Sequence, residues 1–113
     1  MHELGITQEI IKVIDREMLK HQGCKVLGIT LKIGEMSAVV PDSLRFCFKI
    51  LSSGTPLEGA ELRIISVLLI ARCEDCHHKF HVKEFQFLCP LCGSVNHTIL
   101  SGRELLIEQM EVE

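Results

Sequence analysis

Two segments of the chain have the apolar spacing of amphipathic helices. In residues 4–21 the charged side chains avoid one helical face, which is apolar at Ile6, Ile10, Val13, Ile14 and Met18. Residues 41–53 form the second predicted helix, because Pro41 suits a first turn and Gly54 suits a C-terminal cap. Its core stripe is predicted to contain Leu44, Cys47, Phe48 and Leu51, and to be widened by Phe46 and Ile50.

Three other segments have the patterns of strands. Residues 25–33 alternate between apolar and polar side chains, as in a half-buried strand, and end at Gly34. Residues 60–71 begin with the same alternation and become more densely apolar, and residues 104–113 form the last predicted strand. The order is therefore helix, strand, helix, strand, cysteine-containing insert, strand. We expect the insert to separate two strands of one sheet.

Length, charge and hydropathy restrict the possible partners. The 113 residues are 47% apolar, which suffices for one compact domain with a small appendage. A net charge of −3, without a run of Lys or Arg, argues against nucleic acid as a partner. The N-terminus has no uninterrupted apolar signal segment, and the longest apolar run, residues 67–71, is too short to span a membrane. We therefore expect a cytoplasmic protein with no membrane partner, in a compartment that keeps thiols reduced.

The strongest chemical signal is a pair of Cys-x-x-Cys motifs. Cys73 and Cys76 form the first motif and, twelve residues further on, Cys89 and Cys92 form the second. The two-residue spacers allow each motif to fold back as a knuckle, so that four thiolates surround one Zn²⁺ tetrahedrally. Redox chemistry and simple packing of apolar thiols explain the pattern less well, because a redox protein needs only one such motif. Four thiolates fill the coordination shell, so the predicted zinc is structural rather than catalytic.

Other residues near the motifs have simpler interpretations. His77 and His78 follow the first motif, and we expect them to be exposed or to lie behind the ligands rather than to bind zinc. Three aromatic residues between the motifs are predicted to cover the site: Phe80, Phe85 and Phe87. The two remaining cysteines lie at no metal-binding spacing and are interpreted as packed thiols, Cys24 and Cys47.

These elements predict an α+β fold with a small sheet of about three strands, two helices and an inserted zinc-ribbon-like knuckle domain. The larger domain is predicted to be discontinuous, made of residues 1–70 and 98–113. Residues 71–97 form the zinc-binding domain. So short an insert cannot bury enough apolar surface to fold alone, and zinc binding, worth about 10–16 kcal/mol, is expected to drive its folding.

A second candidate metal site lies at the N-terminus, which reads Met1-His2-Glu3. The bulky His2 should prevent removal of Met1. The Met1 α-amine can then form fused chelate rings with the backbone nitrogen and imidazole of His2, and Glu3 adds a nitrogen and an oxygen nearby. Such nitrogen-rich sets suit Ni(II) or Cu(II). Taken alone, however, these three residues fit a frayed terminus with an incidental histidine better.

Five motifs follow one another in a distinctive order along the chain. They are the initial Met-His-Glu-Leu before a helix, Leu31-Lys32-Ile33-Gly34, the run from Pro41 to Phe48, the paired cysteine motifs, and the closing run from Ile107 to Val112. This combination covers essentially the whole chain and resembles the HypA/HybF family of nickel metallochaperones in [NiFe]-hydrogenase maturation. The resemblance implies a nickel-binding α/β domain with a zinc domain inserted before its last strand.

The resemblance also implies a function and its residues. Nickel, the cargo, would be held by Met1, His2 and Glu3, and structural zinc by Cys73, Cys76, Cys89 and Cys92. Members of this family hand Ni(II) to the hydrogenase large subunit together with a maturation GTPase (HypB-like), and some also serve urease. The chain would then be a carrier rather than an enzyme, and a monomer or a weak homodimer.

One departure and one alternative remain open. Some relatives have a histidine beside both cysteine motifs, whereas Gly93 follows Cys92 here. The alternative function is a zinc-ribbon adaptor in transcription or protein assembly, although the acidic balance of the chain disfavours it. An enzyme is disfavoured because the sequence has no evident nucleophile–base pair, Gly-rich phosphate loop or paired catalytic carboxylates.

Overall fold

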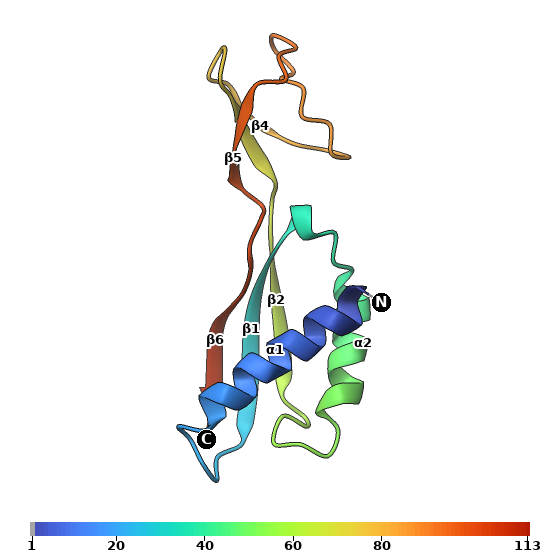
Figure 1. Ribbon diagram of the computed structural model, residues 1–113, viewed down its shortest axis with the longest axis vertical. Helices are drawn as coiled ribbons and strands as arrows, with labels where there is room; N and C mark the ends of the chain where they lie inside the picture. The colour runs from blue at the N-terminus through green and yellow to red at the C-terminus, as the bar shows by residue number, and fades with distance from the viewer. Residues whose placement is uncertain (1) are drawn as a thin grey trace. The chain divides into compact units, whose positions relative to one another are not determined.

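The computed structural model describes residues 2–113, except for the side chain of His2. Within this range there are two α-helices, α1 (His2–Met18) and α2 (Pro41–Ser52), and a short 3-10 helix, η1 (Glu35–Ser37). The strands are β1 (Val26–Gly34), β2 (Glu61–Val67), β3 (Ile70–Cys73), β4 (Lys79–His81), β5 (His97–Ser101) and β6 (Leu105–Val112) (Figure 1). This set of elements confirms the predicted α+β class.

Both predicted helices and the three predicted strands are present, with shifted ends. α1 ends at Met18 because residues 19–21 form tighter turns, in which each N–H bonds to a carbonyl three residues back. The predicted strand 60–71 is divided into β2 and β3 near Leu69, whose N–H donates to the Glu35 carboxylate at 2.6 Å. The strands β4 and β5 have no counterpart among the predicted elements, because three and five residues are too few to show a clear period.

The chain divides into two compact units. The described part of the first unit contains residues 2–31, 39–65 and 106–113, and the second unit contains residues 32–38 and 66–105. The second unit is therefore larger than the predicted insert of residues 71–97. The predicted domain limits stay a prediction, because compactness does not measure whether a segment folds independently.

The first unit has its core between helices and sheet. The sheet order β2–β1–β6 places β1 in the middle, so the insert separates two strands of one sheet, as expected. Helices α1 and α2 pack against each other. The buried apolar side chains of this unit are Ile14, Val26, Ile29, Leu31, Leu44, Cys47, Phe48, Leu57 and Leu62.

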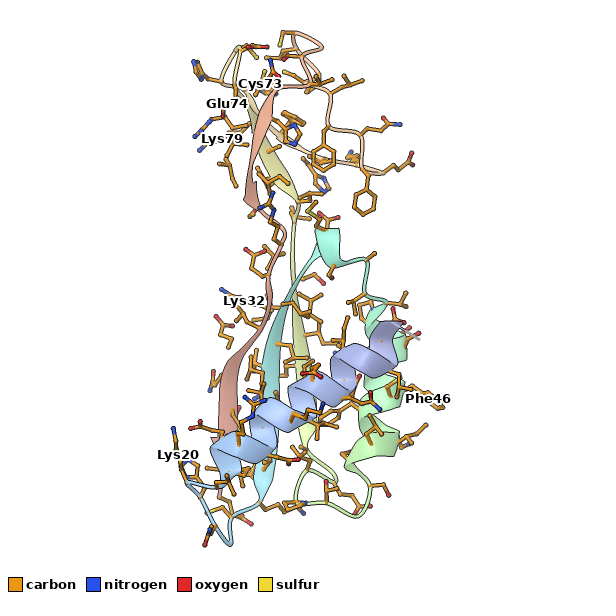
Figure 2. All side chains as sticks on the ribbon, in the orientation of Figure 1. Lys20, Lys32, Phe46, Cys73, Glu74 and Lys79 are labelled. Carbon is orange, nitrogen blue, oxygen red and sulfur yellow. The ribbon has the colours of Figure 1, made fainter. Side chains whose placement is uncertain are left out.

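The predicted apolar faces of the helices are partly wrong. Phe46 and Ile50 do not widen the core stripe of α2, since their side chains are 64% and 57% exposed. Figure 2 shows the Phe46 side chain pointing away from the helix to the outside. At about 100° per residue, Phe46 lies roughly 200° around the helix from Leu44, on the opposite side. Val13 of α1 is also exposed, at 46%, whereas Ile14 beside it is buried.

A polar side chain lies across the other face of this sheet. Arg63 on β2 donates through Nε to the Thr30 hydroxyl at 3.1 Å, and its terminal nitrogens bind Glu61 at 2.9 Å and Glu111 on β6. A Cβ at Gly28 would lie 2.9 Å from one of these nitrogens. The glycine therefore gives the guanidinium room to cross the central strand and to join the two edge strands.

The second unit is a small sheet with its own core. Its strand order is β4–β3–β5, and Ala71 on β3 lies opposite Phe80 on β4 and Ile99 on β5. The core consists of Leu69, Ala71, Cys73, Phe80, Val82 and Cys89. Two of its buried members are cysteines of the paired motifs, so the apolar core and the candidate metal site share residues.

A carboxylate attaches the segment 32–38 to the rest of the second unit. Glu35 accepts the Leu69 N–H at 2.6 Å and contacts His81 Nε2 at 2.8 Å. These two partners, the Leu69 amide first, lower the pKa of Glu35 below its ordinary value. The carboxylate therefore stays charged, and its bonds hold, down to a lower pH than a solvated glutamate would allow.

In the described part of the chain, residues 2–113, none of the helices combines the length and the apolar character that crossing a membrane requires.

Candidate metal centre

The four cysteines of the paired motifs come together at one end of the second unit. Their sulfur atoms all lie within 4.8 Å of one another, and two contacts, Cys73 to Cys92 and Cys76 to Cys89, are 3.5 Å long. Each short contact joins one motif to the other. Cys73 and Cys89 are buried and their partners are exposed, so the cluster lies between the core of the unit and its surface. Figure 2 marks Cys73 at this end of the unit.

The two motifs fold into the same local structure. In each, the first cysteine carbonyl accepts the N–H four residues on, from His77 in one case and Gly93 in the other, both at 2.9 Å. Those two residues both have positive φ angles, 65° and 75°. Glycine adopts this conformation without steric cost, and this requirement explains why Gly93 suits the position after Cys92.

The cluster has the dimensions of a tetrathiolate metal site. With zinc–sulfur bonds of about 2.3 Å, tetrahedral geometry separates neighbouring sulfurs by about 3.8 Å. The observed 3.5 Å contacts, and a largest separation of no more than 4.8 Å, lie close to this value. The residues present therefore fit a tetrahedral ion that prefers sulfur ligands.

Hydrogen bonds within the cluster shift the pKa values of its thiols in opposite directions. The Cys76 N–H, at 3.4 Å from the Cys73 sulfur, is the main reason why the pKa of Cys73 is lowered. Burial raises the pKa of Cys89, but the N–H groups of Cys92 and Leu91 and the neighbouring thiols together lower it to about 7. The N–H of His78 lowers the pKa of Cys76, but donation to the other sulfurs, above all that of Cys89, and burial raise it to about 12. Metal binding displaces the remaining thiol protons, since only thiolates act as ligands.

A carboxylate joins the two motifs independently of the sulfur atoms. Asp75, in the spacer of the first motif, accepts hydrogen bonds from the Ser94 hydroxyl and from the Asn96 side-chain amide at 3.3 Å. The Glu74 N–H donates to the Asn96 carbonyl at 2.9 Å. These three residues were not among the predicted site residues; the available signal was an Asp in one spacer and Ser-x-Asn after the other motif. This bridge orients the ligand-bearing loops toward each other.

We expect Asp75→Ala to accelerate zinc release about tenfold, because residues that orient metal ligands typically contribute 10- to 100-fold to metal affinity. The rate is measured by transfer of zinc to a coloured chelator under first-order conditions. Glu84→Ala, which removes an exposed acid outside the bridge, is the control and should release zinc at the original rate. Equal rates for Asp75→Ala and the unmodified chain would show that the sulfur atoms hold the loops unaided.

The aromatic residues around the cluster agree with the prediction only in part. Phe80 is buried, and Phe87 is half-buried and stacks on His97 with ring centroids 4.6 Å apart. The prediction for Phe85 is wrong, since it is 55% exposed. Glu84 and Phe85 both have positive φ angles in a tight turn, and this turn directs the Phe85 side chain to solvent.

The histidines after the first motif lie outside the cluster. His77 is exposed, and His78 is half-buried with its ring 6.4 Å from that of Phe80. Among the described residues, the group that could hold a metal contains neither of them.

The predicted N-terminal site lies mostly outside the described residues. Met1 and the side chain of His2 belong to the part that the structure does not describe. Glu3 is described: its carboxylate accepts the Val40 N–H at 3.1 Å, and its carbonyl accepts the Thr7 hydroxyl at 2.7 Å. Val40 is the N-cap residue of α2, so Glu3 joins the beginnings of the two helices.

Fold and site together define a metal-binding α+β protein with a four-cysteine centre in its second unit. The chain belongs to the HypA family: residues 1–112 match the family model described as "Hydrogenase/urease nickel incorporation, metallochaperone, hypA". The predicted resemblance is thereby confirmed. The family is one of nickel metallochaperones that act in hydrogenase maturation.

Individual relatives match over the same extent. The chain is 44% identical over 113 residues to a hydrogenase maturation factor HypA of Rippkaea orientalis, covering all of this chain and 96% of that protein. It is 38% identical to that of Geotalea uraniireducens, with both chains fully covered. The solution structure of the Ni metallochaperone HypA from Helicobacter pylori is similar at a TM-score of 0.67 and 26% identity, covering 98% of this chain and 97% of that one.

Proposed function

We propose that this chain carries Ni(II) at its N-terminus and delivers it to the large subunit of a [NiFe]-hydrogenase, with urease as a second candidate recipient. The observation that carries the proposal is the family match over residues 1–112 of a chain that begins Met1-His2-Glu3. In this proposal the chain turns over no substrate of its own. A maturation GTPase is its partner in the transfer, and the cytoplasm is its location.

The proposed nickel ligands are nitrogen atoms of the first three residues. They are the Met1 α-amine, the backbone nitrogen and imidazole of His2, and the backbone nitrogen of Glu3. These nitrogens lie at the start of α1, which begins at His2. The Glu3 carboxylate already binds Val40, and this bond supports the backbone nitrogen as its donor atom. In a chelate at a chain end, the ligands of the metal can be replaced one at a time by ligands of an acceptor protein.

The proposed zinc ligands are Cys73, Cys76, Cys89 and Cys92. Their separations, which fit a tetrahedral sulfur site, support this assignment. Four thiolates leave no open position, so the zinc in this proposal is structural and remains bound while nickel is exchanged. The two metals therefore have different donor sets and different exchange rates.

We expect His2→Ala to abolish stoichiometric nickel binding, because it removes the imidazole and with it one of the fused chelate rings. The measurement is a Ni(II) titration of the untagged, zinc-loaded chain, followed by calorimetry and by the absorbance of planar Ni(II). A tag on Met1 must be avoided, because it would remove the α-amine. Metal analysis of the same samples reports whether zinc is retained.

His21→Ala is the matched control, since it removes another histidine of the same unit, three residues beyond the C-terminal end of α1. It should bind one nickel with unchanged affinity. If His2→Ala binds nickel as tightly as the unmodified chain, the ligand assignment fails. If the unmodified chain retains zinc but binds no nickel, the carrier function fails with it, and a zinc-ribbon adaptor explains the chain better.

A further inference from the structure

One face of α2 carries apolar side chains that no part of the described chain covers. Phe46 and Ile50 lie one helical turn apart and are both more than half exposed. Beside them the half-buried Leu51 lines a hollow between the helices, together with Ile11 of α1. The exposed pair therefore continues into a partly covered apolar groove. Apolar residues that adjoin one another in this way mark surfaces of association, whereas singly scattered ones do not.

One acid and one base lie along the same side of this apolar pair. Asp42 is in the first turn of α2 and Lys49 is in the last, and both are exposed. By helix geometry they lie about 40° and about 60° to the same side of Phe46, roughly 6 Å before it and roughly 4.5 Å after it along the axis. Within residues 2–113, neither side chain has an ion pair or a hydrogen bond. Both charges are therefore available to another molecule.

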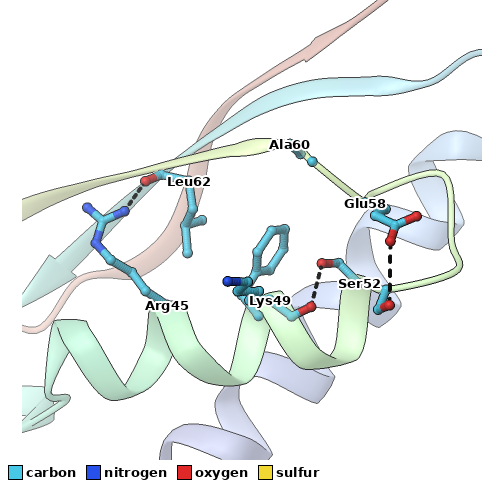
Figure 3. Close-up of a pocket in the computed structure, with 9 residues that line it drawn as sticks. Arg45, Lys49, Ser52, Glu58, Ala60 and Leu62 are labelled. Atoms are coloured by element: carbon cyan, nitrogen blue, oxygen red, sulfur yellow. Dashed lines mark hydrogen bonds between the residues drawn. The ribbon is translucent and has the colours of Figure 1, made fainter.

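The other charged groups around this face are directed elsewhere. Arg45 reaches toward the edge strand β2, where its guanidinium donates to the Leu62 carbonyl (Figure 3). Glu58 lines the pocket on that side of the helix and accepts a hydroxyl hydrogen bond at 3.5 Å. On α1, Lys12 pairs with Glu9 at 3.2 Å. The outward face of α2 thus has an apolar centre, an unpaired acid near one end and an unpaired base near the other.

Such a face is complementary to itself when two copies of the helix run antiparallel. A two-fold axis at Phe46 reverses positions along the helix but keeps the side on which each residue lies. Asp42 of each copy then lies beside the partner's Lys49, because the two residues are at similar distances from Phe46 and on the same side of it. A two-fold contact repeats each such pair, so two opposite-charge pairs form. A parallel arrangement would instead bring like charges to the same height.

We propose that the outward face of α2 binds α2 of a second copy of this chain, antiparallel and centred on Phe46. Burial of the apolar side chains supplies most of the affinity, and the pairs of Asp42 with Lys49 set the orientation. One helix face buries less than the roughly 1,200 Å² of a stable interface, so the dimer is weak and reversible. The contact includes neither metal site, so it stands or falls separately from the proposed function.

The first experiment is sedimentation equilibrium of the full-length, zinc-loaded chain, from about 10 μM to about 1 mM. We expect the average mass to rise with concentration toward that of two chains. Phe46→Glu should weaken the association at least about tenfold, because it places two carboxylates at the centre of an apolar contact. Phe85→Glu makes the same substitution at an exposed phenylalanine of the second unit, and it should leave the dissociation constant unchanged.

A charge exchange tests the orientation. Asp42→Lys and Lys49→Asp each replace two attractive pairs in the dimer with two repulsive ones, and each should weaken the association about fivefold. The double variant, Asp42→Lys with Lys49→Asp, restores opposite charges in both pairs and should recover most of the affinity. Recovery requires that the two residues meet across the contact, because the two single effects would otherwise add.

Three results would overturn the proposal. One is an average mass that stays at that of a single chain over the whole concentration range. Another is self-association of Phe46→Glu as strong as that of the unmodified chain, which would place the contact on a different surface. The third is a double variant that associates no better than the single variants, which would show that Asp42 and Lys49 do not meet across the contact.

Discussion

Replacing Cys73 with serine is expected to abolish zinc binding and to unfold the second unit. Cys73 is fully buried in the core that it shares with Leu69, Ala71 and Phe80. This small core cannot offset the entropy of ordering the surrounding loops, whereas a structural zinc contributes about 10–16 kcal/mol of apparent binding free energy. Removal of one ligand therefore removes both the metal and most of the stabilisation of the unit.

The measurement combines zinc analysis with residue-resolved amide exchange. In Cys73→Ser, zinc content should fall to zero and protection should be lost at Ala71 and Phe80. It should persist at Ile29 and Leu31, because the first unit has a separate apolar core. A strong chelator should produce the same pattern in the unmodified chain.

Cys24→Ser is the matched control, because Cys24 is half-buried and lies outside the four-cysteine cluster. It should retain one zinc and full protection. A folded, zinc-loaded Cys73→Ser would contradict both the ligand assignment and the coupling of metal binding to folding.

Gly34→Ala is expected to have the second large effect, a loss of about 3 kcal/mol or more in the free energy of unfolding. A Cβ at this position would lie 2.0 Å from the Gly102 carbonyl oxygen and 2.7 Å from the Arg103 nitrogen. Both are backbone atoms, so no side-chain rotation relieves the clash. The substitution would also displace the 2.6 Å hydrogen bond from the Gly34 N–H to the Glu104 carbonyl.

Urea denaturation of the zinc-loaded chain measures this loss. Gly5→Ala is the control. Gly5 lies within α1, and a Cβ at this position would meet no atom within 4 Å. Alanine favours the helix over glycine, so Gly5→Ala should stabilise the chain by up to about 1 kcal/mol. Equal urea midpoints for Gly34→Ala and the unmodified chain would mean that the backbone at Gly34 can move away from the backbone at Gly102 with little loss of stability.

Much of the fold was predictable because local patterns carry it. Helical spacing indicated α1 and α2, and Pro41 and Gly54 indicated where α2 begins and ends. The predicted limits of β1 and β6 lie within one residue of the observed ones. Periodicity does not reveal whether an apolar side chain on a helix will face the core or solvent when few other elements cover that helix. Phe46 is apolar, yet it faces solvent because no element covers that side of α2 within the described chain.

The cysteine cluster was predictable for a similar reason. The spacing within each motif sets the local turn, and two such turns require only one ion to bring them together. The Asp75 bridge was not predictable, because its acceptor and its donors lie 19 and 21 residues apart and meet only after β3 and β5 have paired.

By itself, the sequence determined the class of fold, the pairing of the cysteine motifs and the membership of a nickel metallochaperone family. These properties depend on residue type and on short spacings, which the chain carries without folding. Only the tertiary structure decided which strands became edges, that Arg45 covers the edge of β2, and that Gly34 contacts Gly102. Such features arise from the approach of distant segments, and no local pattern specifies which backbone atoms will meet.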